Sequence, residues 1–277
     1  MKIDAHQHFW QYREPEYPWI GPGMDILRRD YLPAEFERVM RSAGFGGSVA
    51  VQARQVPEET TWLLELADAH PFIKGVVGWV DLRSADLRRQ LEQYSRYHAM
   101  RGVRHVVHDE PDDLFMLRKA FLTGISLLAE FGLVYDLLIF PRHLPASWQL
   151  VERFPSQRFV LDHIGKPPIR EGSLEPWSTG IRRLAAFPNV FCKISGMVTE
   201  ADWKAWKVED LTPYLDLVFE VFGTRRLMIG SDWPVCTLSA PYNRVMTAAT
   251  DYLGRFSPEE QKLVLEENAR RIYRLRQ

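Results

Sequence analysis

The stretch Lys2-Ile3-Asp4-Ala5-His6-Gln7-His8 has the pattern of a short apolar strand that ends in two histidines. Residues two apart in a strand point to the same face, so His6 and His8 aim both imidazoles at one spot. Converging imidazoles suit a metal ion, or a pair of hydrogen-bond donors to one substrate oxygen. The alternative is a pair of unrelated surface or capping histidines, because a short motif is weak on its own. The rest of the chain decides between the two.

The composition is typical of a globular protein and argues against several classes of partner. Of 277 residues, 46% are hydrophobic and 26% are charged, and the formal net charge is -1. That balance argues against nucleic acid or an anionic membrane surface. Cys192 and Cys236 form no Cys-x-x-Cys pair, which argues against a disulfide framework and favours a reducing compartment. No secretory signal or bilayer-spanning apolar run is visible, so we expect a cytoplasmic protein.

Apolar strands alternate with amphipathic helices along the whole chain. The pattern predicts strands at 2–8, 47–52, 73–81, 102–107, 133–140, 159–164, 190–195 and 226–232. Helices are expected at 33–43, 57–67, 84–98, 113–131 (the longest), 145–154, 179–187 and 211–222, with two more from 242 and 258. Eight strand–helix units predict a single α/β domain over residues 1–277, a (β/α)₈ TIM barrel. A long first connection, residues 9–32, and the C-terminal helices elaborate it. The competing fold is an open doubly wound sheet, but no glycine-rich phosphate loop follows the first strand.

Polar residues collect where the predicted strands end. In such barrels the active site lies at the C-terminal ends of the strands, so a shared pocket explains these residues better than eight separate accidents. They are His6 and His8; Gln52 and Arg54; Trp79 and Asp81; Arg104, His105 and His108; Asp136; Asp162, His163 and Lys166; Lys193 and Ser195; and Ser231 and Asp232.

Several motifs along the chain resemble the amidohydrolase superfamily. They are Asp-Ala-His-Gln-His-Phe-Trp at 4–10, Leu-Asp-His-Ile-Gly-Lys-Pro at 161–167, Cys-Lys-Ile-Ser-Gly at 192–196, Gly-Ser-Asp-Trp-Pro at 230–234 and Asn-Ala-Arg-Arg-Ile-Tyr at 268–273. Within the superfamily, called amidohydrolase 2 or TIM-barrel metal-dependent hydrolases, the chain is most similar to sugar-lactone and pyrone-lactone hydrolases. Fuconolactonases and rhamnonolactonases are the nearest types. The resemblance implies a hydrolase that opens a sugar lactone to the aldonic acid.

The resemblance also implies catalytic roles and a metal site. His6 and His8 match the pair that holds a metal or polarises a carbonyl, His163 matches the strand-six histidine, and Asp232 matches the aspartate that activates water. One divalent ion, with zinc favoured, is expected on His6, His8 and Asp232, with His163 as an optional fourth ligand. Catalysis without metal is the alternative. Arg104 and His105 stand where two-metal relatives carry a lysine or glutamate, so we do not expect a second ion.

Substrate contacts are expected from seven further residues near the strand ends. Cationic side chains donate to ring hydroxyls or a carboxylate, and aromatic rings pack on a sugar face. The alternative for each cation is that it pairs with an acid such as Asp136 or Asp162. The seven residues are Trp10, Gln52, Trp79, Arg104, His105, Lys166 and Lys193.

Two further readings of the function stay open. One is another amidohydrolase-type reaction, either hydrolysis of a pyrone-dicarboxylate lactone or decarboxylation of an aromatic acid. The other is a ligand-binding barrel without turnover. The expected partner is a small molecule, with no nucleic acid and no membrane, and the oligomeric state is open, with a homodimer as one option.

Overall fold

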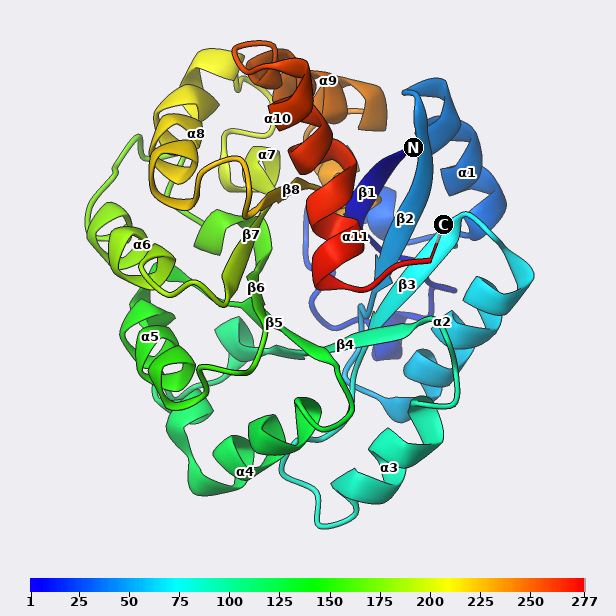
Figure 1. Cartoon of the computed structure of the whole chain (residues 1–277). Coiled ribbons are helices and arrows are strands. Elements are labelled where there is room, and N and C mark those ends of the chain that lie inside the picture. Colours follow the sequence, from blue (N-terminus) through cyan, green and yellow to red (C-terminus); the bar gives the residue numbers. More distant parts are fainter. Residues whose placement is uncertain (277) are drawn as a thin grey trace.

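The computed structural model describes residues 1–276 and contains eight parallel strands in one sheet, paired in chain order (Figure 1). The strands are β1 (Lys2–Gln7), β2 (Phe45–Val51), β3 (Ile73–Gly78), β4 (Met100–Val106), β5 (Val134–Leu138), β6 (Phe159–Leu161), β7 (Val190–Ile194) and β8 (Leu227–Ile229). Helices surround the ring of strands, so the predicted (β/α)₈ barrel is confirmed.

The helices begin where proline and the apolar period predict them. Pro33, Pro57 and Pro258 each occupy the first turn of a helix, where a missing N–H costs no hydrogen bond. The helices are α1 (Pro33–Ser42), α2 (Pro57–Ala69), α3 (Leu87–Tyr94), α4 (Lys119–Leu128), α5 (Leu144–Arg153), α6 (Trp177–Ala185), α7 (Met197–Glu200), α8 (Val208–Phe222), α9 (Tyr242–Leu253), α10 (Pro258–Lys262) and α11 (Asn268–Ile272). Within residues 1–276, no helix has the length and apolar character needed to cross a membrane.

One predicted helix, residues 113–131, is wrong in its first third. A 3₁₀ turn at Phe115–Leu117 and an extended Arg118 precede α4, so the longest helix is α8, with 15 residues. The Asp112 carboxylate accepts hydrogen bonds from the backbone N–H of Leu114 at 2.9 Å and from Arg118 Nε at 2.8 Å. These local bonds hold a turn in place of the helix that the apolar spacing indicates.

The barrel interior is packed with side chains from alternating strand positions, as the period of two requires. The inward-facing set is Ile3, Ala5, Val49, Val51, Val77, Val134, Val160 and Met228. Helix α11 lies across the barrel end at which the chain begins, and Ala269, Ile272 and Tyr273 join the same core (Figure 1). The Tyr273 hydroxyl lies within 2.9 Å of both carboxylate oxygens of Asp136. This end of the barrel is therefore closed, which leaves the opposite end for a site.

The seam between β1 and β8 lies at the predicted site. The Asp232 backbone N–H donates to His6 O at 2.8 Å, and His8 N–H donates to Trp233 O at 2.6 Å. A Cβ at Gly230 would lie 2.7 Å from His6 Cβ, so only glycine permits this approach of the two strands. The backbone bonds that join the first and last strands therefore also set the spacing of the site residues.

The long first connection folds on itself around an aromatic cluster. Trp10 forms a bridge with Tyr31, and its ring packs against those of Tyr17, Trp19 and Tyr31. Trp10 is completely buried, and its Nε1 donates to Arg29 O at 2.9 Å. The connection is thus an ordered wall beside the barrel mouth.

Candidate active site

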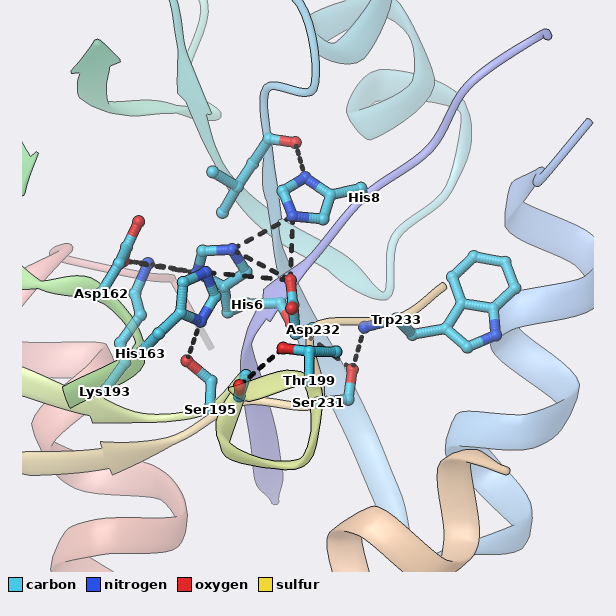
Figure 2. Close-up of polar contacts among 12 residues, drawn as sticks. His6, His8, Asp162, His163, Lys193, Ser195, Thr199, Ser231, Asp232 and Trp233 are labelled. Atoms are coloured by element: carbon cyan, nitrogen blue, oxygen red, sulfur yellow. Dashed lines mark hydrogen bonds and ion pairs between the residues drawn. The ribbon is translucent and has the colours of Figure 1, made fainter. Parts of the chain in front are cut away.

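Four side chains from three strand ends converge at the mouth of the barrel. His6 Nε2 lies 3.2 Å from His8 Nε2 and 3.7 Å from Asp232 Oδ1. His8 Nε2 lies 3.2 Å and His163 Nε2 lies 3.9 Å from the same carboxylate oxygen. Figure 2 shows the three imidazoles pointing toward Asp232. The expected convergence is present, while the catalytic roles of these residues stay predictions.

Unusual backbone conformations aim two of the four side chains. His163 and Asp232 have φ values of 53° and 59°, in the left-handed region that non-glycine residues seldom adopt. Such conformations cost on the order of 1–2 kcal/mol each, and they cluster at functional sites. His163 Nδ1 lies 2.9 Å from Ser195 Oγ, and a Cβ at Gly196 would lie only 2.4 Å from that nitrogen. Glycine at 196 therefore makes room for the imidazole.

The local electrostatics favour neutral imidazoles beside a charged carboxylate. Burial, aided by the nearby Lys193 ammonium, holds the pKa of His6 well below its usual range. Burial also lowers the pKa of His163 to about 4. Burial alone would raise the pKa of Asp232, but the neighbouring His163, His8 and His6 outweigh it and keep that pKa below its usual range. At neutral pH the site therefore offers an ionised carboxylate next to the unprotonated imidazoles of His6 and His163.

The donor set fits a divalent cation. His8 Nδ1 lies 2.8 Å from Val51 O, and a carbonyl oxygen can only accept, so Nδ1 carries a proton and the neutral form of the ring has its lone pair on Nε2. In that form the lone pair lies 3.2 Å from an Asp232 oxygen, where a cation between the two atoms would bind both. Among residues 1–276, two groups have ligand atoms within 4.8 Å of one another: His6, His8 and Asp232, and His6, Asp162 and His163. The first is the set expected from the sequence.

Lys193 lies beneath the site and does not line the cavity. Its ammonium is fully buried and contacts Asp136 Oδ2 at 2.6 Å, Asp162 Oδ1 at 3.0 Å and His6 Nδ1 at 3.2 Å. Pairing with acids, the alternative raised for this residue, therefore describes it better than substrate contact. Figure 2 shows Lys193 and Asp162 beside the His6 and His163 rings, where they can orient the candidate metal ligands.

Arg104 reaches the cavity but is already engaged. Its Nη1 donates to Asp162 Oδ2 at 3.0 Å, and its Nη2 donates to Gln52 Oε1 at 2.9 Å and to Gln52 O at 2.5 Å. Gln52 is fully buried, holds Arg104 and does not line the cavity, and its substrate contact stays a prediction.

A cavity of about 890 Å³ opens onto this cluster. Of the predicted catalytic and binding residues, those that line it are His8, Arg104, His163, Lys166 and Asp232. The first loop contributes Trp19 and Met24, and the segment after β8 contributes Val235 and Leu238. The wall therefore combines polar groups at the strand ends with apolar groups from the loops, which is the usual character of a small-molecule site.

Besides Lys193 and Gln52, three more of the predicted substrate contacts do not line the cavity. Trp10 is held inside the first loop, as described above. Arg104 and His105 are neighbours in β4, so their side chains point to opposite faces, and only Arg104 can enter the barrel. His105 instead lies 2.6 Å from Glu110 Oε1 and 3.4 Å from the Nε1 of Trp79. His105 and Trp79 thus form a pair on the outer side of the strand.

Sequence reasoning missed several lining residues on the later loops. Glu200 and Thr199 belong to α7, and Trp203 follows it. Asp109 lines the wall after β4, next to His108, whose position at a strand end was noted. The only signal for these residues was that they follow strand ends, since no motif marks them.

The comparisons agree with this geometry. The family profile described as "Amidohydrolase" matches residues 3–275. L-fucono-1,5-lactonase of Burkholderia multivorans is 42% identical over 99% of this chain and 96% of that protein. L-fucono-1,5-lactonase of Burkholderia ambifaria is 36% identical, again over 99% and 96%. A crystal structure of an amidohydrolase from Burkholderia multivorans with bound zinc matches with a TM-score of 0.97 and 42% identity over 100% of both chains. The chain therefore belongs to the amidohydrolase family.

Proposed function

We propose that this chain hydrolyses a sugar lactone to the corresponding aldonic acid, with L-fucono-1,5-lactone as the first candidate substrate. The observation that carries the proposal is the Asp232 carboxylate among three imidazoles at the wall of a cavity of about 890 Å³. The 42% identity to an L-fucono-1,5-lactonase over 99% of the chain supports it. In this proposal residues 1–277 act as one catalytic domain, and the partner is the small-molecule lactone.

The reaction needs a base for water and donors for two oxygens. Water adds to the lactone carbonyl carbon, the ring C–O bond breaks, and the ring oxygen takes a proton to give the hydroxy acid. Asp232 accepts the proton of the attacking water, because its lowered pKa keeps it ionised. His163 is neutral, and where it is not a metal ligand, donation from Ser195 to its Nδ1 leaves the proton on Nε2 available to a substrate oxygen.

A metal ion is the second part of the proposal. One divalent ion, zinc first, is held by His6, His8 and Asp232, with His163 as an optional fourth ligand. When bound, such an ion supplies an electrophile for the carbonyl oxygen. The protein's own contribution is a rigid ligand set, because the Val51 carbonyl fixes His8, and Lys193 and Asp162 flank His6.

The charges of the cavity favour a neutral substrate over a dicarboxylate. Each of the three lining cations, Arg54, Arg104 and Lys166, already contacts a carboxylate. The partners are Glu16 and Glu59 for Arg54, Asp162 for Arg104, and Glu200 for Lys166. A substrate carboxylate would have to compete with these acids, whereas hydroxyl groups can share the pairs. This argues against a pyrone dicarboxylate or an aromatic acid.

The test is a substrate panel on purified protein with a defined metal content. Acid release from neutral 1,5-aldonolactones is compared with turnover of a pyrone dicarboxylate and an aromatic acid. We expect hydrolysis of the neutral lactones alone. Chelation should reduce the rate at least about tenfold, and one equivalent of zinc should restore it. If chelation leaves the rate unchanged, the metal-free mechanism stands, and zinc-replete protein without activity on any lactone would refute the function.

A further inference from the structure

Lys166 and Glu200 form an ion pair on the cavity wall next to His163. Lys166 Nζ contacts Glu200 Oε1, and their side chains are 14% and 19% exposed. Both residues line the cavity. The contact engages one N–H of the ammonium and one oxygen of the carboxylate, so further donors and an acceptor remain side by side for a ligand.

A strained turn brings Lys166 to this wall. His163, Ile164 and Lys166 have φ values of 53°, 49° and 51°, and Gly165 between them has 75°, so the chain makes a left-handed turn. Lys166 N–H donates to His163 O at 2.8 Å, which closes the turn. Side chains three apart in such a tight turn lie on the same side. Non-glycine residues adopt this conformation only where the surroundings enforce it, often at functional sites.

The ion pair is not needed to join the two loops that carry it. The Arg170 backbone N–H donates to Glu200 O at 3.0 Å, and Trp177 Nε1 donates to Ile164 O at 2.8 Å. These bonds already anchor the loop after β6 to α7 and to α6. A partly buried ion pair also contributes little net stability. The orientation of the pair toward the cavity therefore has a cause other than loop anchoring.

The geometry points to Lys166 and Glu200 as the pair that recognises adjacent hydroxyl groups on the lactone ring and so selects among polyhydroxylated lactones. This inference rests on the proposed function and adds the residues that determine its specificity. The pair as a whole is neutral, so it matches a diol, which both donates and accepts, better than a carboxylate. His108 on the same wall has a buried Nδ1 without a hydrogen-bond partner among residues 1–276, which also suits a hydroxylated ligand.

The experiment pairs each variant with substrates that lack one hydroxyl at a time. The variants are Glu200→Gln and Lys166→Met, and the substrates are a 1,5-aldonolactone and its monodeoxy analogues. For the parent enzyme, loss of the recognised hydroxyl should lower kcat/KM about 10–100-fold, the usual effect of a hydrogen bond to a charged group. In the variants, loss of the same hydroxyl should lower kcat/KM less than about threefold, because the protein partner of that hydroxyl is gone. Loss of any other hydroxyl should lower kcat/KM by the same factor in the parent and in the variants.

Two controls separate recognition from loop anchoring. Glu220→Gln removes the exposed ion pair with Arg182 and should leave the substrate pattern unchanged. The exchange Lys166→Glu with Glu200→Lys keeps an ion pair but reverses donor and acceptor, so the parental discrimination should not return. Equal loss on all analogues, or full rescue by the exchange, overturns this inference alone. A parent enzyme that hydrolyses no lactone overturns the proposed function, and this inference with it.

Discussion

Replacement of Asp232 by asparagine tests the proposed base with little disturbance of the fold. Asparagine keeps the size of the side chain and removes the basic lone pair. It also tolerates the φ of 59° at this position better than alanine would. The backbone bonds from Asp232 N–H to His6 O and from Cys236 N–H to Asp232 O do not depend on the side chain. We therefore expect the melting temperature to change by no more than about 3 °C.

The expected loss of turnover follows from the role of a general base. Such a base contributes roughly two to four orders of magnitude, equivalent to about 3–5 kcal/mol of barrier. The assay is acid release from the lactone, with zinc content and thermal unfolding measured on the same preparation. Asp232→Asn protein that binds zinc normally and remains fully active would refute the base assignment. A variant that unfolds at much lower temperature while its folded fraction is active would show that Asp232 only anchors the loop.

Three further outcomes are expected. The pKa of His163 is near 4 and that of Asp232 is below its usual range, so His163 stays neutral and Asp232 stays ionised well below neutral pH. We therefore expect kcat/KM to be flat from about pH 5 to 7 and to fall only toward pH 4. An inflection near pH 6.5 would contradict these pKa shifts. Burial raises the pKa of Glu59 from its usual 4.5 to about 7, so its contribution to stability is complete below pH 4.5 and is lost as the pH rises through 7. In urea unfolding, the free energy of unfolding of the parent protein should fall by roughly 3 kcal/mol across that window, and Glu59→Gln should abolish this fall. Lys193→Met leaves two buried carboxylates without their ammonium partner and should lower the free energy of unfolding in urea by about 3–5 kcal/mol. The control Lys262→Met breaks an exposed ion pair and should lower it by less than about 0.5 kcal/mol.

The fold was predictable because its signal repeats eight times. Each strand is an apolar run and each helix has an apolar stripe, so a single error, such as the helix expected at 113–131, does not change the architecture. That error arose because residues 115–117 are apolar and continue the helical pattern, whereas periodicity does not reveal the hydrogen bonds of Asp112 that bend the chain.

The strand ends that form the candidate site could be predicted from the sequence, but the direction of each side chain could not. His6, His8, His163 and Asp232 could be singled out, because polar residues that end apolar strands need a shared reason. Which neighbour enters the barrel, as with Arg104 and His105, depends on the register of the strands. The depth at which Lys193 lies depends on the tilt of β7, which the sequence does not reveal.

The seam between β1 and β8 also bears on when the proposed metal site can form. His8 and Asp232 are 224 residues apart, and they become neighbours only when the last strand docks against the first. A nascent chain that ends before residue 232 lacks the Asp232 carboxylate, so it cannot complete the ligand set of His6, His8 and Asp232. In the proposed enzyme, zinc held by these three residues therefore marks a finished barrel.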